Sequence, residues 1–207
     1  MSPIPLSVII ALSTKDIAIF KLKEEEMSYI KKKSKAQEVR TAKEFGGKTQ
    51  LASGALWTAK GDVRTGGERT SSFNETDFLI ENKFTDKPYF ILKKDTWDKI
   101  SREAIEDNFR TPLMQIDILD DLELVIMDLN DYKGFNLEEH MQILSETITT
   151  NKKSFRIDYD KFNDLDRRAY KMMLTPVIFL TLGDNKPVRL VIMKNSDFIY
   201  IWEKVEK

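Results

Sequence analysis

Residues 76–85 have the sequence Thr-Asp-Phe-Leu-Ile-Glu-Asn-Lys-Phe-Thr, an apolar centre followed by charged side chains. An apolar run between polar flanks is typical of a strand that is buried on at least one face. Side chains alternate along a strand, so Glu81 and Lys83 should project from the same face as neighbours. The segment therefore predicts a buried strand that carries an acid and a lysine side by side.

A helix is predicted upstream of this strand. Residues 34–45 are good helix formers, with Ser34 as a candidate cap and a pair of glycines after the last residue as a typical stop signal. This helix would carry Glu38. Glu44 lies on the same helix and is an alternative candidate for an acid that reaches a site.

Between helix and strand, residues 51–69 are rich in Gly, Ser and Thr and predict a loop with short strand pieces. The loop contains Asp62. A carboxylate there, beside Glu81, would give two hard oxygen ligands for magnesium or manganese. Lys83 could then stabilise the charge that develops on a phosphate, or help orient and deprotonate an attacking water. Glu38 could add a third carboxylate.

The composition removes several other chemistries. The 207 residues include no cysteine, which excludes disulfides, thiolate zinc sites, iron–sulfur clusters and cysteine nucleophiles. The one histidine, His140, has no serine in a nucleophile elbow to act with. No phosphate-binding Gly-x-x-x-x-Gly-Lys-Ser/Thr motif is present, so we expect no nucleotide cofactor. Oxygen ligands and lysine remain as the catalytic equipment.

The net charge of −1 hides two opposed regions. Residues 27–70 contain ten basic and four acidic side chains, whereas residues 111–150 contain one basic and nine acidic side chains. Such asymmetry suggests a charged partner. The basic region also carries part of the candidate site, so the overall neutrality does not argue against a nucleic-acid partner.

The second half of the chain contains an internal repeat. Residues 90–132 and 155–198 align with an offset of 64 to 66, and each copy is expected to be strand, helix, strand, strand. The matches include Leu124-Val125-Ile126-Met127 with Leu190-Val191-Ile192-Met193, and Thr111-Pro112 with Thr175-Pro176. Generic patterning shared by two similar units is the alternative explanation.

Further elements are predicted around the repeat. The strand after Pro112 should pair with residues 124–129 across a turn. The first helix of the repeat should begin with Asp95 as its cap. A helix over residues 136–148 should bridge the copies. The second copy is expected to be partial, because no counterpart of the polar residues upstream of Phe90 is evident.

The order helix acid, Asp after a loop, then Glu-X-Lys on a strand followed by a helix resembles the PD-(D/E)XK nuclease superfamily. The surrounding residues are similar to archaeal-type Holliday junction resolvases and their phage relatives over about residues 30–130. The motifs that carry this resemblance are Ser53-Gly54-Ala55, Lys60-Gly61-Asp62-Val63, Asp77-Phe78-Leu79-Ile80-Glu81-Asn82-Lys83, Arg102-Glu103-Ala104 and Pro112-Leu113-Met114.

The resemblance implies an α/β fold of restriction-endonuclease-like type, a mixed sheet flanked by helices. It implies catalytic roles for Glu38, Asp62, Glu81 and Lys83. By the same resemblance, Asp62 and Glu81 are ligands of Mg²⁺ or Mn²⁺. Two departures stand out: Gly replaces the nominal Pro before the aspartate, and an insert at residues 65–74 lengthens the spacing. The expected DNA-binding residues are Lys31, Lys35, Ser53, Arg64 and Arg69.

The expected organisation is an N-terminal extension at residues 1–26, a nuclease core at 27–132 and an α+β extension at 133–207. The apolar run at residues 4–11 is too short to span a bilayer and could be an extra strand paired with residues 17–22. We expect no membrane association and an intracellular, cytoplasmic location, in a host cell if the gene is from a phage.

The implied function is a magnesium-dependent, structure-selective DNA endonuclease, a resolvase of recombination and repair that acts as a homodimer on four-way junctions. One alternative is a non-catalytic DNA-binding or interaction module on a degenerate nuclease fold. Another is a nuclease that acts on flapped, nicked or modified DNA.

Overall fold

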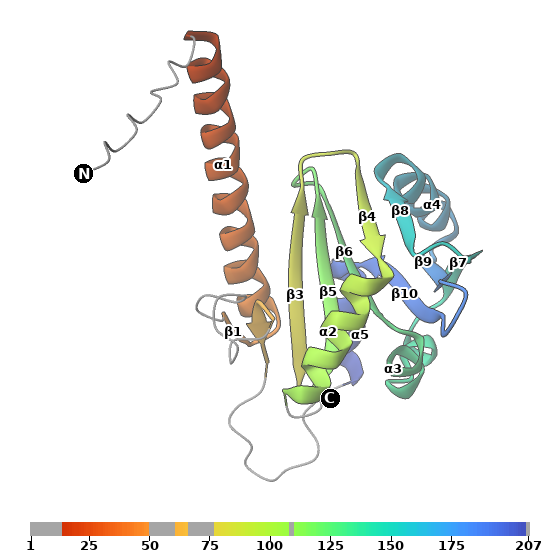
Figure 1. Ribbon diagram of the computed structural model, residues 1–207. Helices are drawn as coiled ribbons and strands as arrows, with labels where there is room; N and C mark the ends of the chain where they lie inside the picture. Colours follow the sequence, from red (N-terminus) through yellow and green to blue (C-terminus); the bar gives the residue numbers. More distant parts are fainter. Residues whose placement is uncertain (1–13, 50–60, 66–76, 108–109, 206–207) are drawn as a thin grey trace.

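The computed structural model describes residues 14–49, 61–65, 77–107 and 110–205 (Figure 1). Its helices are α1 (Thr14–Glu44), α2 (Lys94–Glu106), α3 (Leu129–Gly134), η1 (Leu137–His140), α4 (Tyr159–Met172) and α5 (Asn195–Val205). Its strands are β1 (Lys48–Thr49), β2 (Val63–Arg64), β3 (Phe78–Thr85), β4 (Tyr89–Lys93), β5 (Thr111–Ile118), β6 (Leu122–Asp128), β7 (Ile143–Thr150), β8 (Ser154–Asp158), β9 (Thr175–Leu182) and β10 (Val188–Lys194).

Eight of the described strands form one mixed sheet in the order β1-β2-β3-β5-β6-β10-β9-β7. The pairs β3–β5 and β7–β9 are parallel, and the other pairs of this sheet are antiparallel. The remaining two strands, β4 and β8, form an antiparallel ribbon. The coarse expectation of an α/β fold with a mixed sheet flanked by helices is therefore confirmed.

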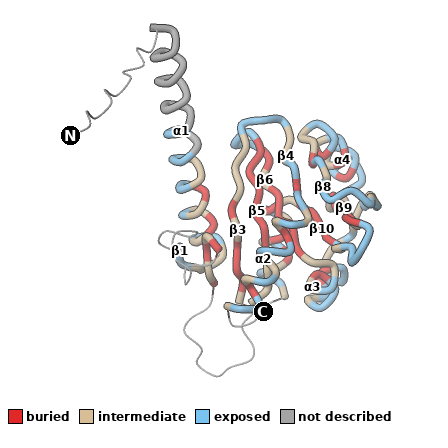
Figure 2. The backbone as a smooth tube through the Cα atoms, in the orientation of Figure 1, coloured by how far each residue is buried: buried red, intermediate tan, exposed pale blue. Residues whose placement is uncertain are grey.

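Helices cover both faces of the sheet, which explains why its central strands are almost continuously apolar. One core contains α2, α4, the β4–β8 ribbon and the even-numbered side chains of β5. The other core contains α3, α5, the last turn of α1 and the odd-numbered side chain Leu113 of β5. Figure 2 shows the buried residues concentrated in the central strands.

The two halves of the sheet repeat each other. The elements β3, β4, α2, β5, β6 and α3 correspond in order to β7, β8, α4, β9, β10 and α5. The buried residues of α2 and α4 also correspond, with Trp97, Ile100 and Ala104 in one helix and Phe162, Leu165 and Ala169 in the other. The repeat predicted from the sequence is confirmed as a repetition of structure.

The copies are related by an approximate twofold axis. Equivalent strands pair antiparallel with each other, β6 with β10 and β4 with β8. Ile126 lies opposite Ile192, its own equivalent at an offset of 66. Ile91 lies opposite Arg156, its equivalent at an offset of 65. Both pairs therefore mark points on the axis.

Two predictions about the second copy are wrong. Residues 136–148 do not form one helix, because η1 ends at His140 and β7 begins at Ile143. The β-branched residues at positions 147–150 favour a strand, and burial along β7 alternates accordingly. The second copy is also less partial than expected, since β7 is the counterpart of β3 and Glu146 stands at the position of Glu81.

The first helix is longer than predicted. It runs from Thr14, so Ser34 lies in its interior and residues 17–22 are helical. The predicted cap Asp95 instead lies in the first turn of α2, whose N-cap is Lys93. Residues 4–11 lie outside the described residues.

The predicted domain limits do not coincide with breaks in the structure. Position 26/27 falls within α1, and position 132/133 falls within α3, while the sheet continues across both copies. Among the described helices, none is long and apolar enough to cross a membrane.

Candidate active site

Asp62 is held against the edge of β3 by two hydrogen bonds. Its backbone N–H donates to the carbonyl of Ile80 (2.9 Å), and its Oδ2 accepts from the backbone N–H of Asn82 (2.8 Å). The preceding Gly61 has φ +66°, and a Cβ there would lie 2.6 Å from a leucine carbon of β3. Glycine is therefore required before Asp62, and the turn delivers the carboxylate beside Glu81.

Glu81 and Lys83 lie on one face of β3, as their alternation predicts. Lys83 Nζ is 2.5 Å from Glu81 Oε1. The glutamate side chain is 17% exposed and that of the lysine is 34% exposed. The pair is therefore partly buried yet open to solvent.

The carboxyl of Glu81 is electrostatically disfavoured as an anion. Burial raises the pKa of Glu81, and the neighbouring Asp62 raises it further. Lys83 and Lys99, the latter on α2, act in the opposite direction but do not cancel the shift. Burial is the main reason that the Glu81 anion is disfavoured, and the nearby Asp62 carboxylate adds to it.

Glu38 reaches this site from α1 because the next turn of that helix is tied to the sheet. Gln37 Nε2 donates to the carbonyl of Lys83 (3.3 Å), and the Thr41 hydroxyl hydrogen-bonds Asn82 Oδ1 (2.8 Å). Gln37 and Thr41 are both buried. The helix is thereby fixed against β3, with Glu38 beside its anchor residue.

The pKa of Glu38 responds to the other two acids. Burial raises the pKa of Glu38, with further contributions from Asp62 and Glu81, while Lys35 lowers it. Carboxylates from α1, from the turn before β2 and from β3 therefore converge at one edge of the sheet. In Figure 1 this edge lies between α1 and α2.

The two candidate helix acids are separated by the structure. Glu44 Oε2 accepts from Asn195 Nδ2 at 3.0 Å, at the first residue of α5. That contact holds Glu44 at the C-terminal end of α1, six residues beyond Glu38. Glu38 is the acid of α1 that interacts with Asp62 and Glu81.

The expected DNA-binding residues have different surroundings. Lys31 and Lys35 are exposed on α1. Arg64 instead forms an ion pair with Asp107, with Nε 2.9 Å from Oδ2. Ser53 and Arg69 lie outside the described residues. The described basic groups that border the site therefore come mainly from helices.

Two polar residues on or next to neighbouring strands, Gln115 and Asp77, have other roles. Gln115 is completely buried beneath α1, where it hydrogen-bonds with Thr41 on the face of the sheet opposite Glu81. Asp77 directly precedes β3 and pairs with Arg110, with Oδ2 3.2 Å from Nη1. Neither residue contributes to the acidic group.

Sequence reasoning missed Lys99 and the two anchors of α1. Lys99 is exposed on α2, with its Nζ 3.7 Å from Glu103 Oε1. Its charge lowers the pKa of Glu81, so it borders the site. The sequence could have indicated the two anchor residues, because Gln37 and Thr41 are four residues apart and therefore share one face of the predicted helix. The helix after the Glu-X-Lys strand is likewise a natural place to look for basic residues.

The grouping of the acids limits the kind of metal site that they could form. Among the residues that the structure describes, no group of three or more His, Cys, Asp or Glu side chains is close enough together to hold one metal ion. Magnesium is often bound by only one or two carboxylates, with water and substrate phosphate as the other ligands. Asp62 and Glu81 are the two carboxylates that could hold an ion in this way.

Comparisons with protein-family models, with curated proteins and with solved structures find no match to this chain. Its function must therefore be inferred from its own residues.

Proposed function

We propose that this protein is a Mg²⁺- or Mn²⁺-dependent DNA endonuclease that hydrolyses a phosphodiester bond of branched DNA, with the four-way junction as its favoured substrate. The observation that carries the proposal is the convergence of Glu38, Asp62 and Glu81 from three separate elements beside Lys83. Oxygen ligands with an adjacent lysine are the equipment of metal-assisted phosphoryl chemistry.

The arrangement of the first copy supports a restriction-endonuclease-like core. Its elements follow the order α1, β1, β2, β3, β4, α2, β5, with β4 outside the main sheet and β5 parallel to β3. The aspartate precedes β2 and the Glu-X-Lys triplet lies on β3, which is the order that the PD-(D/E)XK resemblance requires. Fold alone does not determine function, so the proposal rests on the side chains of the site.

Each residue has a defined task in this proposal. Asp62 and Glu81 would hold the metal ion, and Glu38 would orient its water ligands or add a further carboxylate. A bound divalent ion supplies Lewis-acid stabilisation and lowers the pKa of its water. Lys83 would leave its contact with Glu81 to stabilise the phosphate charge or to orient the attacking water. Lys35 and Lys99 would contact neighbouring phosphates.

A nuclease assay tests the proposal. A labelled four-way junction and a linear duplex of the same sequence are incubated with the protein in Mg²⁺ or in EDTA. We expect cleavage of the junction only with metal, and at least a 100-fold loss of rate in Glu81→Ala and Lys83→Ala. Full activity in both variants would end the nuclease proposal. Cleavage of flapped or nicked DNA in preference to the junction would keep the chemistry and change the substrate.

A second function is a DNA-binding or interaction module on a degenerate nuclease fold. One observation favours it: the described residues contain no ready-made group of three metal ligands. The two proposals differ in metal dependence. Junction binding that is tight, insensitive to metal and without any cleavage would support the module.

A further inference from the structure

The strand β7 has an open edge. It is the last strand of the described sheet, opposite the end that carries α1, and it pairs only with β9 among the described strands (Figure 1). Thr175 N–H donates to the carbonyl of Gln142, and Gly183 N–H donates to that of Thr150. Backbone groups alternate in direction along a strand, so the even-numbered residues of β7 face β9. The N–H and C=O groups of residues 143, 145, 147 and 149 therefore point outwards.

This edge lacks the usual protection. Exposed edge strands commonly carry lysine, proline or a bulge, or are very short, because an open edge invites another strand. β7 is eight residues long, contains neither lysine nor proline, and has five β-branched residues. Its equivalent in the first copy, β3, is covered at the same edge by β2. The second copy has no such cover among the described residues.

The charge of the edge is balanced within the chain. Glu146 is the one charged residue of β7, and it pairs with Arg168 of α4. A basic or acidic peptide would thus find no unpaired charge on β7. An edge without unpaired charge can pair with a second copy of the same strand.

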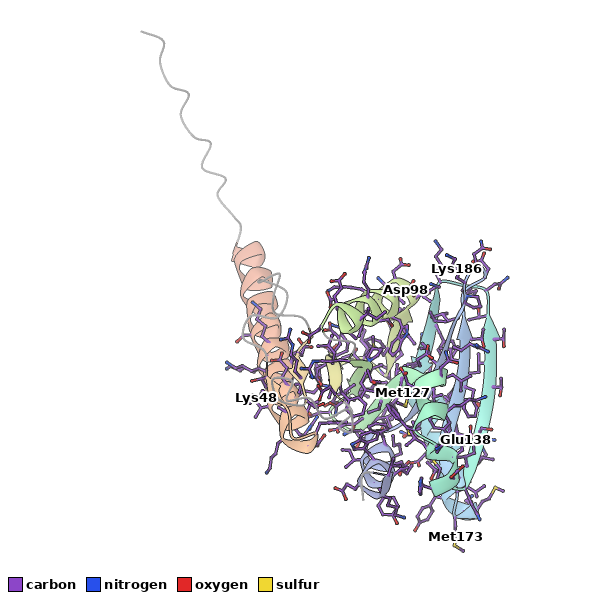
Figure 3. The ribbon with its side chains drawn as sticks, turned by 90° about the horizontal axis from the view of Figure 1, so that it is seen from below. Lys48, Asp98, Met127, Glu138, Met173 and Lys186 are labelled. Atoms are coloured by element: carbon purple, nitrogen blue, oxygen red, sulfur yellow. The ribbon has the colours of Figure 1, made fainter. Side chains whose placement is uncertain are left out.

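Apolar side chains are exposed beside this edge. Tyr170, Met172 and Met173, at the C-terminal end of α4, are 83%, 59% and 92% exposed. Met172 follows Arg168 by one helical turn and so lies on the side of α4 that faces β7. Figure 3 shows Met173 at the rim of the molecule, pointing away from it. Exposed Tyr and Met are enriched in protein interfaces.

We propose that two copies of this chain pair antiparallel through β7, with Thr147 opposite Thr147 of the second copy. Outward-facing residues must pair with outward-facing residues, which restricts the register. Centring the pair on Glu146 would place two carboxylates directly opposite each other, which is destabilising. Centring it on Thr147 places Glu146 opposite Ile148 instead. The pairing concerns assembly and does not rest on the proposed nuclease chemistry.

The absence of cysteine provides a clean test of this register. In the full chain, Thr147→Cys should form a disulfide-linked dimer under mild oxidation, because the two Cα atoms of a directly opposite pair are about 5.5 Å apart. Ser145→Cys should not, since the two copies of residue 145 would be roughly 13 Å apart. Combining Ser145→Cys with Thr149→Cys should restore the link.

Light scattering on the uncrosslinked protein gives the second arm. We expect a dimer for the wild type and for Thr147→Val, and at least a tenfold weaker dimer for Thr147→Pro, which removes only an outward N–H. A monomeric wild type would overturn the proposal. So would equal crosslinking of the residue 145 and 147 cysteine variants, which does not depend on how well the proline variant folds.

Discussion

The two copies, residues 78–134 and 143–205, share a topology and differ in chemistry. In the first, Glu81, Asn82 and Lys83 follow one another on β3, whereas the equivalent positions on β7 hold Glu146, Thr147 and Ile148. The lysine is thus replaced by an apolar residue. Glu146 pairs with Arg168, whereas Glu81 interacts with Asp62 as well as with Lys83.

The difference shows that the residues that build the fold are not the residues that form the candidate site. Shared apolar positions, such as Trp97 and Phe162 in the equivalent helices, build both halves alike. The candidate site additionally needs α1 and the turn before β2, which hydrogen bonds tie to β3 of the first copy. A strand position becomes a site only where further elements bring carboxylates to its edge.

The largest contrast is expected in the rate of DNA cleavage. Lys83→Ala should lower the rate about 10²–10³-fold, because it removes a cation aimed at developing phosphate charge. Glu146→Gln, the matched change in the second copy, should leave the rate unchanged. Single-turnover cleavage of a junction measures both. Equal losses in the two variants would mean that the copies do not differ in function.

The next effect concerns the axis between the copies. Ile126 and Ile192 are fully buried and lie opposite each other. Either Ile→Ala change should lower the free energy of unfolding by about 2–5 kcal/mol. The double variant should lose less than the sum, because the two residues are in contact. Urea denaturation checks this, and strict additivity would argue against a shared packing site.

A smaller effect is expected where α1 joins the first copy. Thr41→Val removes the hydroxyl that hydrogen-bonds Asn82 and Gln115, leaving buried amide groups without a partner. We expect a loss of about 1–3 kcal/mol in the free energy of unfolding. Thr149→Val, at an exposed position of the second copy, should change it by no more than about 0.5 kcal/mol. Similar losses in both would contradict the anchoring role of Thr41.

The smallest effect is a pH dependence beneath α1. Burial raises the pKa of Asp117, although its ion pair with Arg40 opposes the shift. The folded state then binds protons more readily than the unfolded state, so ionisation of Asp117 destabilises the protein above its folded pKa. Asp117→Asn should therefore raise the melting temperature at pH 7, and the difference should shrink as the pH falls toward about 4. If the difference in melting temperature grew on acidification, the pKa of Asp117 would be lowered and not raised by folding.

Much of the fold could be predicted from local patterns. The strand at residues 76–85, the pair of β5 and β6, and the repeat all follow from apolar runs and from Leu-Val-Ile-Met occurring twice. The helix predicted over residues 136–148 was wrong because Leu137, Met141, Leu144 and Ile148 have helical spacing. The residues at the end of this segment are β-branched and favour a strand. The N-terminal extent of α1 was missed because its first half carries no clear apolar period.

The site was only partly predictable for a different reason. The contact between Glu81 and Lys83 follows from alternation along one strand, a local property. The choice of Glu38 over Glu44 depends on how α1 lies against β3, which is set by the bond from Gln37 to the backbone of Lys83. Such contacts join residues 46 positions apart, and a local pattern does not specify them.

The most direct test of the central claim is calorimetric titration with Mn²⁺ of the full chain and of three variants. We predict that the wild type and Glu146→Gln bind the ion alike, and that Asp62→Asn and Glu81→Gln abolish or greatly weaken binding while remaining folded by circular dichroism. Equal binding by all four proteins, or none by the wild type, would contradict a metal site at the edge of β3.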